Sequence, residues 1–130
     1  MFALDTNTVI YLFKGRGRVR SRVELLPPRL LAIPILVLYE LEVGAAKSES
    51  PDRRKADLEQ LLSVVRVLPF EAGEAKTAAA IRARLESLGN QIGPIDTLVA
   101  GIALHHGAVL VTNNVDEFSR VEGLSIENWL

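Results

Sequence analysis

The sequence predicts an α/β/α sandwich around a central, mainly parallel sheet of about four or five short strands. Two observations carry this prediction: short apolar runs of strand length recur along the chain, and they alternate with longer segments whose apolar residues recur at helical spacing. Such alternation is typical of parallel strands joined by helices. The chain has 130 residues, of which 48% are hydrophobic and 24% charged, so residues 1–130 are expected to form one folded domain.

The first strand is predicted at Phe2–Leu4, where a short apolar run ends abruptly in Asp5. Thr6 and Asn7 are good N-cap residues, so a helix is expected through Phe13. A carboxylate at the carboxyl end of a strand lies at the sheet edge where α/β proteins bind ligands and metals. Asp5 could instead simply cap the helix, and this stretch alone leaves both interpretations open.

The middle of the chain continues the alternation. Pro27 and Pro28 end a short helix over residues 18–26, and a second apolar run at 30–33 is the next strand. Pro34 then opens a helix in which Gly44 indicates close packing or a fraying end.

After a polar linker at 48–52, apolar residues at helical spacing predict a helix over 53–65. A strand-like piece at 67–70 contains Pro69, which favours a strand end or edge. The remaining elements are an alanine-rich helix at 71–88, a helix at 95–106, a buried strand at 108–111, one helical turn at 115–118 and a last strand at 124–127.

Composition excludes several classes of protein. No cysteine is present, which excludes disulfides and thiolate metal sites and is compatible with a reducing cytosol. No signal-peptide pattern is visible, and no apolar run reaches the ~20 residues of a membrane span. The expected location is therefore cytoplasmic, with no membrane partner.

Acids and amides recur at strand ends and helix starts. Glu40 shares a helical stripe with Leu36 and Val43 and is predicted to be buried. Burying a carboxylate is costly unless it is paired or metal-bound. Asp96 lies among apolar residues at a helix start, although it can also serve as a favourable charge there. The last group follows the strand at 108–111 and comprises Thr112, Asn113, Asn114, Asp116 and Glu117.

Carboxylates that meet at one sheet edge repel each other, and a divalent cation relieves that repulsion. Oxygen ligands without cysteine or a spaced histidine pair favour Mg²⁺, with Mn²⁺ as the alternative. Such sites activate water for attack on phosphodiesters. The adjacent pair His105 and His106 is expected to satisfy carbonyls of the last helical turn rather than to form a site, and Trp129 is expected to pack.

A basic block follows the first helix, although the formal net charge of the chain is −1. Such a block can bind a polyanion, or it can be an ordinary solvated helix face. Its residues are Lys14, Arg16, Arg18, Arg20 and Arg22.

Four motifs in order resemble those of PIN-domain nucleases, and in particular the VapC-type toxins described as initiator-tRNA endonucleases. The resemblance covers essentially the whole chain. The motifs are Leu4-Asp5-Thr6-Asn7, Tyr39-Glu40-Leu41-xx-Gly44, Ile95-Asp96-Thr97-Leu98-Val99-Ala100 and Val111-Thr112-Asn113-Asn114-xx-Glu117-Phe118.

The resemblance implies a Mg²⁺-dependent endoribonuclease toxin that hydrolyses RNA, with initiator tRNA as a candidate substrate. Asp5 and Asp96 match the principal metal ligands, and Glu40 matches a further acid that binds directly or through water. For the fourth acid, the resemblance favours Glu117 over Asp116. Asn114 occupies a position where the family often has Asp, which weakens a second metal site and leaves catalysis with one metal ion as an alternative.

The same resemblance implies supporting residues and partners. Thr6 and Asn7 would orient Asp5, while Thr112 and Asn113 would bond to the Asp5 cluster or the scissile phosphate. The implied partners are a VapB-like antitoxin and a second copy of the chain in a homodimer. The basic block is assigned to contact with RNA or an acidic antitoxin tail.

Two alternatives to the nuclease interpretation remain open. The spacing of Asp5, Asn7 and Thr8 distantly resembles the nucleophile loop of haloacid-dehalogenase-type phosphatases, but Asn7 cannot act as the general acid. The other alternative is a catalytically degenerate PIN module that binds RNA or protein, which Asn114 favours. Retention of three acids argues against it.

Overall fold

The computed structural model describes all 130 residues and contains a five-stranded parallel sheet. The strands lie in the order β3-β2-β1-β4-β5. They are β1 (Phe2–Leu4), β2 (Leu31–Pro34), β3 (Arg66–Leu68), β4 (Val109–Val111) and β5 (Ile126–Glu127). The predicted fold class is confirmed, and every strand pair is parallel.

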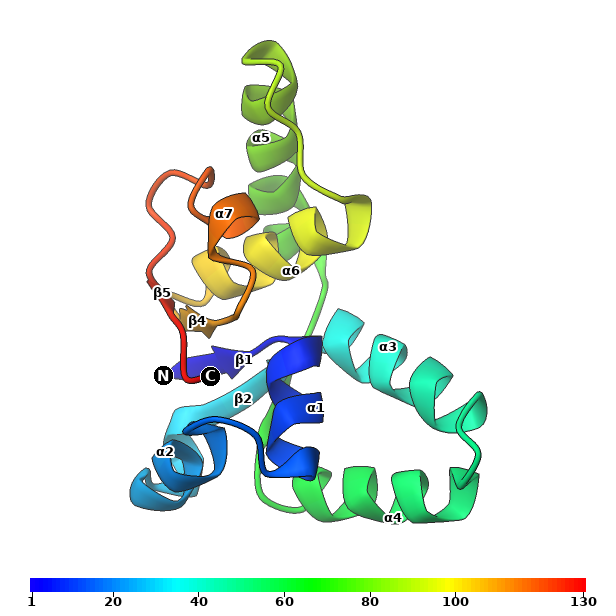
Figure 1. Ribbon diagram of the computed structural model, residues 1–130. Coiled ribbons are helices and arrows are strands. Elements are labelled where there is room, and N and C mark those ends of the chain that lie inside the picture. The colour runs from blue at the N-terminus through cyan, green and yellow to red at the C-terminus, as the bar shows by residue number, and fades with distance from the viewer.

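Seven α-helices connect the strands, and Figure 1 shows the strands between α5–α7 and α1–α4. The helices are α1 (Thr6–Lys14), α2 (Val19–Leu25), α3 (Ile35–Ala46), α4 (Pro51–Leu62), α5 (Ala72–Ser87), α6 (Pro94–His105) and α7 (Val115–Phe118). A 3₁₀ turn, Pro28–Leu30, precedes β2. None of these helices has the combined length and apolar composition that a membrane-spanning helix requires.

The strand order reverses beside β1. The chain builds β1, β2 and β3 outward in one direction and then returns to place β4 on the other side of β1. In open parallel sheets, ligands bind in the crevice outside the carboxyl ends of the strands at such a reversal. The topology therefore directs attention to the residues that follow β1 and β4.

Nearly all the buried apolar side chains form one cluster, whose members include Ala3 and Trp129. Trp129 is buried, as expected, and its ring lies 5.3 Å from that of Phe2 between centroids. Arg18 N–H donates to the Trp129 carbonyl oxygen at 2.9 Å. The two termini consequently lie side by side, as Figure 1 shows.

Several element bounds differ from the predictions for local reasons. Asp5, not Thr6 or Asn7, is the N-cap of α1, because its Oδ1 accepts the Thr8 N–H at 2.9 Å. Helix α4 begins earlier than predicted because Pro51 suits the first helical position. It ends at Leu62, where the Ser63 hydroxyl donates to the Gln60 carbonyl oxygen at 2.6 Å.

Shorter shifts affect the strands. Strand β2 begins one residue later than predicted and includes Pro34, while β3 ends at Leu68, before Pro69. Strand β5 is only Ile126–Glu127, half of the predicted run.

Candidate active site at the sheet reversal

The ends of β1 and β4 are joined by a small polar network. Asp5 N–H donates to the Val111 carbonyl oxygen at 3.1 Å, and the Thr8 hydroxyl donates to the same oxygen at 3.0 Å. Asp5 is only 8% exposed, and Thr112 is completely buried. The first residue after each strand is thus held rigidly at the predicted sheet edge.

A pocket of about 160 Å³ opens at this edge. It is lined by Asp5, Thr6, Asn7, Val37, Glu40, Asp96, Val99, Asn114 and Phe118. Three acids predicted from separate motifs therefore meet, while no lysine or arginine lines the pocket.

Asp5 combines the two roles that the sequence left open. It caps α1 and also faces the pocket. Burial raises the pKa of its carboxyl group, and the Glu40 charge adds to that shift. Hydrogen-bonding groups of Thr112 and Thr8 act in the opposite direction. Thr112 therefore lies beside Asp5, in agreement with the prediction.

Glu40 lies at the pocket edge rather than on the buried stripe of α3. The buried positions of that helix are Val37, Leu41 and Ala45, whereas Val43 is exposed and Glu40 is half-buried. The prediction that Glu40 lies in the buried row of this helix was therefore wrong, because the buried row begins one position later, at Val37. The Thr6 hydroxyl donates to Glu40 Oε1 at 2.6 Å, so Thr6 orients Glu40 and not Asp5.

Asp96 carries the strongest electrostatic signature of the site. It lies half-buried in the first turn of α6. Burial, then a hydrogen bond with the Glu117 carboxyl group, then the charges of Glu117, Glu40 and Asp5 raise the pKa of Asp96 to about 7. Four carboxyl groups thus interact at one place, and at least one of them holds its proton at neutral pH more readily than an ordinary aspartate.

The candidates for the fourth acid separate clearly in space. Glu117 is half-buried, is one of the groups that raise the pKa of Asp96, and accepts the Asn114 side-chain N–H at Oε2 over 2.6 Å. Asp116 is exposed and lies outside the pocket lining. Asn113 is also exposed, and its Oδ1 accepts from Asn128 at 3.4 Å. Asn114 therefore lines the pocket, and Glu117 joins the site through Asp96 and Asn114 without lining it, whereas Asp116 and Asn113 do neither.

The donor set suits a hard divalent cation that retains much of its water. No three histidine or acidic side chains are arranged around one point as a complete ligand set. Mg²⁺ commonly takes one or two carboxylates and completes its coordination with water and phosphate oxygens. Uncompensated carboxylates at a pocket without cationic side chains fit that mode of binding.

Comparison with known proteins identifies the family of this chain. The family model described as PIN domain matches residues 2–124. This chain belongs to the PIN-domain family. It is 40% identical over 129 residues to a Shigella flexneri protein named tRNA(fMet)-specific endonuclease VapC, covering 98% of this chain and 97% of that protein. It is 38% identical to Ribonuclease VapC2 of Haemophilus influenzae, covering 99% and 98% of the two chains.

Solved structures of VapBC complexes have the same fold. A Salmonella typhimurium VapBC chain in a DNA-bound complex superposes with a TM-score of 0.92 at 40% identity, covering 99% of this chain and 98% of that chain. A chain of VapBC2 from Rickettsia felis, bound to a promoter DNA fragment, gives the same TM-score at 34% identity and the same coverage. Membership of the PIN-domain family removes the support for the phosphatase alternative.

The basic block of this PIN domain does not form one uniform surface. Arg22 pairs with Glu127 at 3.0 Å and lies 5.1 Å from the centroid of the Trp129 ring. Arg20 donates to the Leu12 carbonyl oxygen, while Arg18 forms no salt bridge. Lys14, Arg16 and Arg18 are exposed and form no ion pair, which leaves them accessible to an anionic partner.

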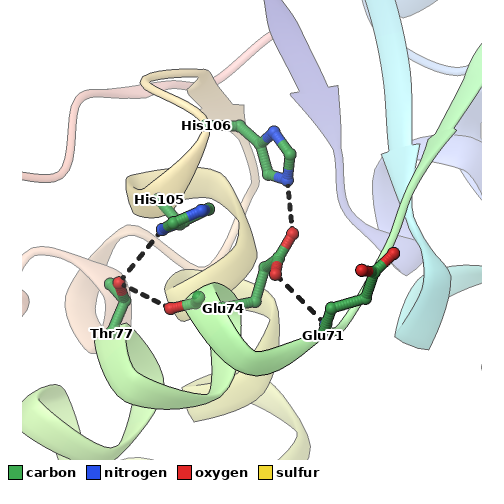
Figure 2. A network of polar contacts seen from close by, with 6 residues as sticks. Glu71, Glu74, Thr77, His105 and His106 are labelled. Atoms are coloured by element: carbon green, nitrogen blue, oxygen red, sulfur yellow. Dashed lines mark hydrogen bonds and ion pairs between the residues drawn. The ribbon is translucent and has the colours of Figure 1, made fainter.

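His105 and His106 have partners that the sequence did not predict (Figure 2). His106 Nε2 lies 2.8 Å from Glu74 Oε2, and His105 Nδ1 lies 3.4 Å from the Thr77 hydroxyl. Glu74 is 4% exposed and also accepts the Glu71 N–H at 3.1 Å. These histidines therefore bond to α5, not to the carbonyls of their own last turn.

Proposed function

We propose that this PIN domain is a metal-dependent endoribonuclease, the toxin of a toxin–antitoxin pair, with tRNA as its substrate class and initiator tRNA as the first substrate to test. The observation that carries the proposal is the convergence of Asp5, Glu40, Asp96 and Glu117 at the sheet reversal. Near-full-length similarity to a protein named tRNA(fMet)-specific endonuclease VapC supports the substrate class, and similarity to one named Ribonuclease VapC2 supports ribonuclease activity.

Mg²⁺, with Mn²⁺ as a substitute, is the proposed cofactor. Asp5, Asp96 and Glu40 would hold it, and the bound ion would supply charge neutralisation and an activated water for attack on a phosphodiester. The Thr6 hydroxyl fixes one Glu40 oxygen, and the Asn114 amide fixes one Glu117 oxygen. These hydrogen bonds prepare the carboxylates before substrate arrives.

Size and charge restrict what enters this pocket. Its volume of about 160 Å³ accommodates a phosphate group and a few waters but not a whole nucleotide. Because the lining holds acids and no basic side chain, a phosphate enters only together with a cation. RNA must therefore lie across the pocket, with its remaining contacts elsewhere on the surface.

The proposed partners follow from the relatives. Matching solved chains come from VapBC complexes, so we propose a VapB-like antitoxin for this chain, together with a homodimer and action in the cytoplasm where tRNA resides.

The deciding experiment incubates purified protein, free of antitoxin, with total bacterial RNA in the presence and absence of Mg²⁺ or Mn²⁺. Discrete metal-dependent fragments are expected, and sequencing their ends identifies the substrate. Asp5→Asn should abolish them, while the matched control Asp116→Asn should not, because Asp116 is exposed outside the pocket. Equal cleavage by the wild type and Asp5→Asn would refute the assignment.

The second candidate is a degenerate PIN module that binds RNA without cutting it. Asn114 in an acid slot and the absence of a complete three-residue ligand set favour it. Calorimetric titration of Mn²⁺ into the wild type and into Asp96→Asn separates the candidates. The nuclease requires binding that the substitution weakens, whereas the degenerate module retains RNA with no metal dependence.

A further inference from the structure

Asn7 lines the acidic pocket with a side-chain amide that forms no hydrogen bond within the chain. It is an exposed residue in the first turn of α1, which follows β1 directly (Figure 1). The sequence predicted that Asn7 would orient Asp5. The carboxyl group of Asp5 instead takes its hydrogen bonds from Thr8 and Thr112, so that prediction was wrong.

The other polar side chains of the lining have little left to donate. Its three acids accept hydrogen bonds and, when ionised, donate none. The Thr6 hydroxyl donates its only proton to Glu40 at 2.6 Å. The Asn114 amide already donates one N–H to Glu117 at 2.6 Å, which fixes its orientation. Asn7 is therefore the lining residue whose amide keeps both of its N–H donors free.

A phosphate that enters this pocket needs such a donor. A cation can neutralise its charge, but the phosphate oxygens that face away from the cation still require an N–H or O–H partner once they leave water. No lysine or arginine lines the pocket to supply one. An asparagine amide is among the usual partners of phosphate oxygens and, being neutral, does not repel a cation bound beside it.

We propose that the side-chain amide of Asn7 donates to a non-bridging oxygen of the RNA phosphate in the acidic pocket and so fixes the position of that phosphate against the carboxylates. This inference rests on the proposed ribonuclease function. Asn7 is two residues from Asp5, the N-cap of the same helix, so one rigid element holds both the donor and a carboxylate of the site.

The first test compares matched substitutions of two asparagines. Asn7→Ala removes the amide, and Asn7→Asp keeps its shape while replacing both N–H donors with a charged acceptor. An acid suits the first turn of a helix, so Asn7→Asp should fold normally, which thermal unfolding checks. Asn113→Ala and Asn113→Asp make the same changes at an exposed position outside the pocket.

With an initiator tRNA transcript as substrate, we expect Asn7→Ala to lower kcat/KM by about tenfold or more, the scale of one lost hydrogen bond to a charged group. Asn7→Asp should lower it at least as far, because its carboxylate also repels the phosphate. Both Asn113 variants should match the wild type. Wild-type values of kcat/KM for both folded Asn7 variants would overturn the proposal.

The second test separates a phosphate contact from a metal ligand. The amide carbonyl oxygen of an asparagine can itself bind Mg²⁺ or Mn²⁺. Mn²⁺ is therefore titrated calorimetrically, without RNA, into the wild type and into Asn7→Ala. We expect equal affinities, since the amide acts on the phosphate. Mn²⁺ binding that is about tenfold weaker in Asn7→Ala would assign Asn7 to the metal ion and overturn the proposal.

The third test observes the amide directly and does not depend on activity. Inorganic phosphate is titrated, in the presence of saturating Mg²⁺, into ¹⁵N-labelled wild-type protein. The side-chain NH₂ signals of Asn7 should shift, those of Asn113 should not, and Asn7→Ala should bind phosphate about tenfold more weakly. Phosphate binding that leaves the Asn7 side-chain signals in place would overturn the proposal.

Failure of the proposed function gives a different pattern. If the wild type cleaves no RNA with any metal while phosphate still shifts the side-chain signals of Asn7, the phosphate contact is supported and the nuclease assignment fails. If the wild type cleaves RNA, both Asn7 variants cleave equally well and phosphate causes no shift at Asn7, the nuclease stands and the phosphate contact is overturned.

Discussion

Helix α6 has a carboxylate cluster near each end, and the two clusters balance their charges in opposite ways. At the start of the helix, Asp96 faces Glu117, Glu40 and Asp5 without a cationic side chain, and its pKa rises to about 7. Beyond the other end, Glu74 is buried against His106. The N–H of Glu74 itself, then the His106 ring and the Glu71 N–H, lower the pKa of Glu74 despite the opposing effect of burial.

The difference distinguishes a structural carboxylate from a functional one. A buried carboxylate with all its partners present stabilises the fold and needs nothing else. Carboxylates that face only one another lower stability until a cation arrives, and perturbed groups of this kind gather at active sites. The same helix therefore has one end whose carboxylate is satisfied and fixes α5 against α6, and another end whose carboxylates are uncompensated, where we propose that a cation binds.

The largest expected effect comes from Asp96→Asn, which should change activity and stability in opposite directions. RNA cleavage should fall by about 100-fold or more, because the proposed metal ion would lose a principal ligand. The free energy of unfolding at pH 8 should rise by about 1–2 kcal/mol. This value is reduced for solvent screening because Asp96 is only half-buried. Denaturant unfolding and single-turnover cleavage measure the two effects.

The raised pKa of Asp96 in the folded state determines how the stability of the wild type changes with pH. Below the ordinary pKa of 3.8, Asp96 is protonated in both the folded and unfolded states. Between about 4 and 7 only the folded state keeps the proton, so the stability of the wild type falls as pH rises and stays lower above 7. The advantage of Asp96→Asn should therefore grow across this window. A difference in stability between Asp96→Asn and the wild type that does not vary with pH would contradict the proposed repulsion between the carboxylates.

Glu74→Gln should show the reverse pattern. Because the folded-state pKa of Glu74 is lowered, the ionised side chain stabilises the protein above its ordinary value of 4.5, and this contribution is lost as pH falls through the folded pKa. The variant should unfold at a lower temperature at pH 7, with a difference that narrows toward pH 3. Cleavage should persist below the unfolding transition. A loss of cleavage by folded Glu74→Gln would break the division between the two clusters.

The sequence predicted the acidic cluster better than its supporting hydrogen bonds. Asp5, Asp96 and Glu117 each lie beside a recognisable strand end or helix start, and parallel topology brings such positions to one edge. Glu40 was placed on the wrong stripe because α3 is apolar on nearly all sides. In such a helix, packing against neighbouring elements decides which row is buried, and local spacing cannot.

The Glu74–His106 pair could not be predicted from the sequence for a related reason. Its two residues are 32 positions apart and meet only because α5 and α6 pack closely. A Cβ at Gly101 would lie 2.5 Å from that of Ala78, so glycine permits this approach. The only signal in the sequence was local: Glu71 and Glu74 have the spacing of a capping box, and that motif is present at the start of α5.

Thr6→Val tests whether the acidic end is preorganised. The substitution keeps the shape of the side chain but removes the hydroxyl that donates to Glu40. We expect cleavage to fall about tenfold and the Mn²⁺ concentration needed for half-maximal activity to rise, which is the usual scale for residues that orient a ligand. Thr77→Val, which removes the hydroxyl beside His105 at the other cluster, is the matched control and should leave both quantities unchanged.

The smallest expected effect extends the comparison from acids to cations. Arg22 has both an ion pair with Glu127 and the Trp129 ring as partners, whereas Arg16 lies over the Tyr11 ring without an ion pair and Arg18 has neither kind of partner. Replacing Arg16 and Arg18 together with alanine should weaken RNA binding a few-fold and flatten its log–log salt dependence by about 0.7 for each phosphate that is no longer neutralised.

Arg22→Ala should instead lower stability by about 0.5–1 kcal/mol and leave the salt slope unchanged. Filter binding across a salt series measures the slope. If all three arginines contributed equally to the salt slope, pairing within the protein would not distinguish structural from functional cations. The contrast between the two acidic clusters would then not extend to the arginines.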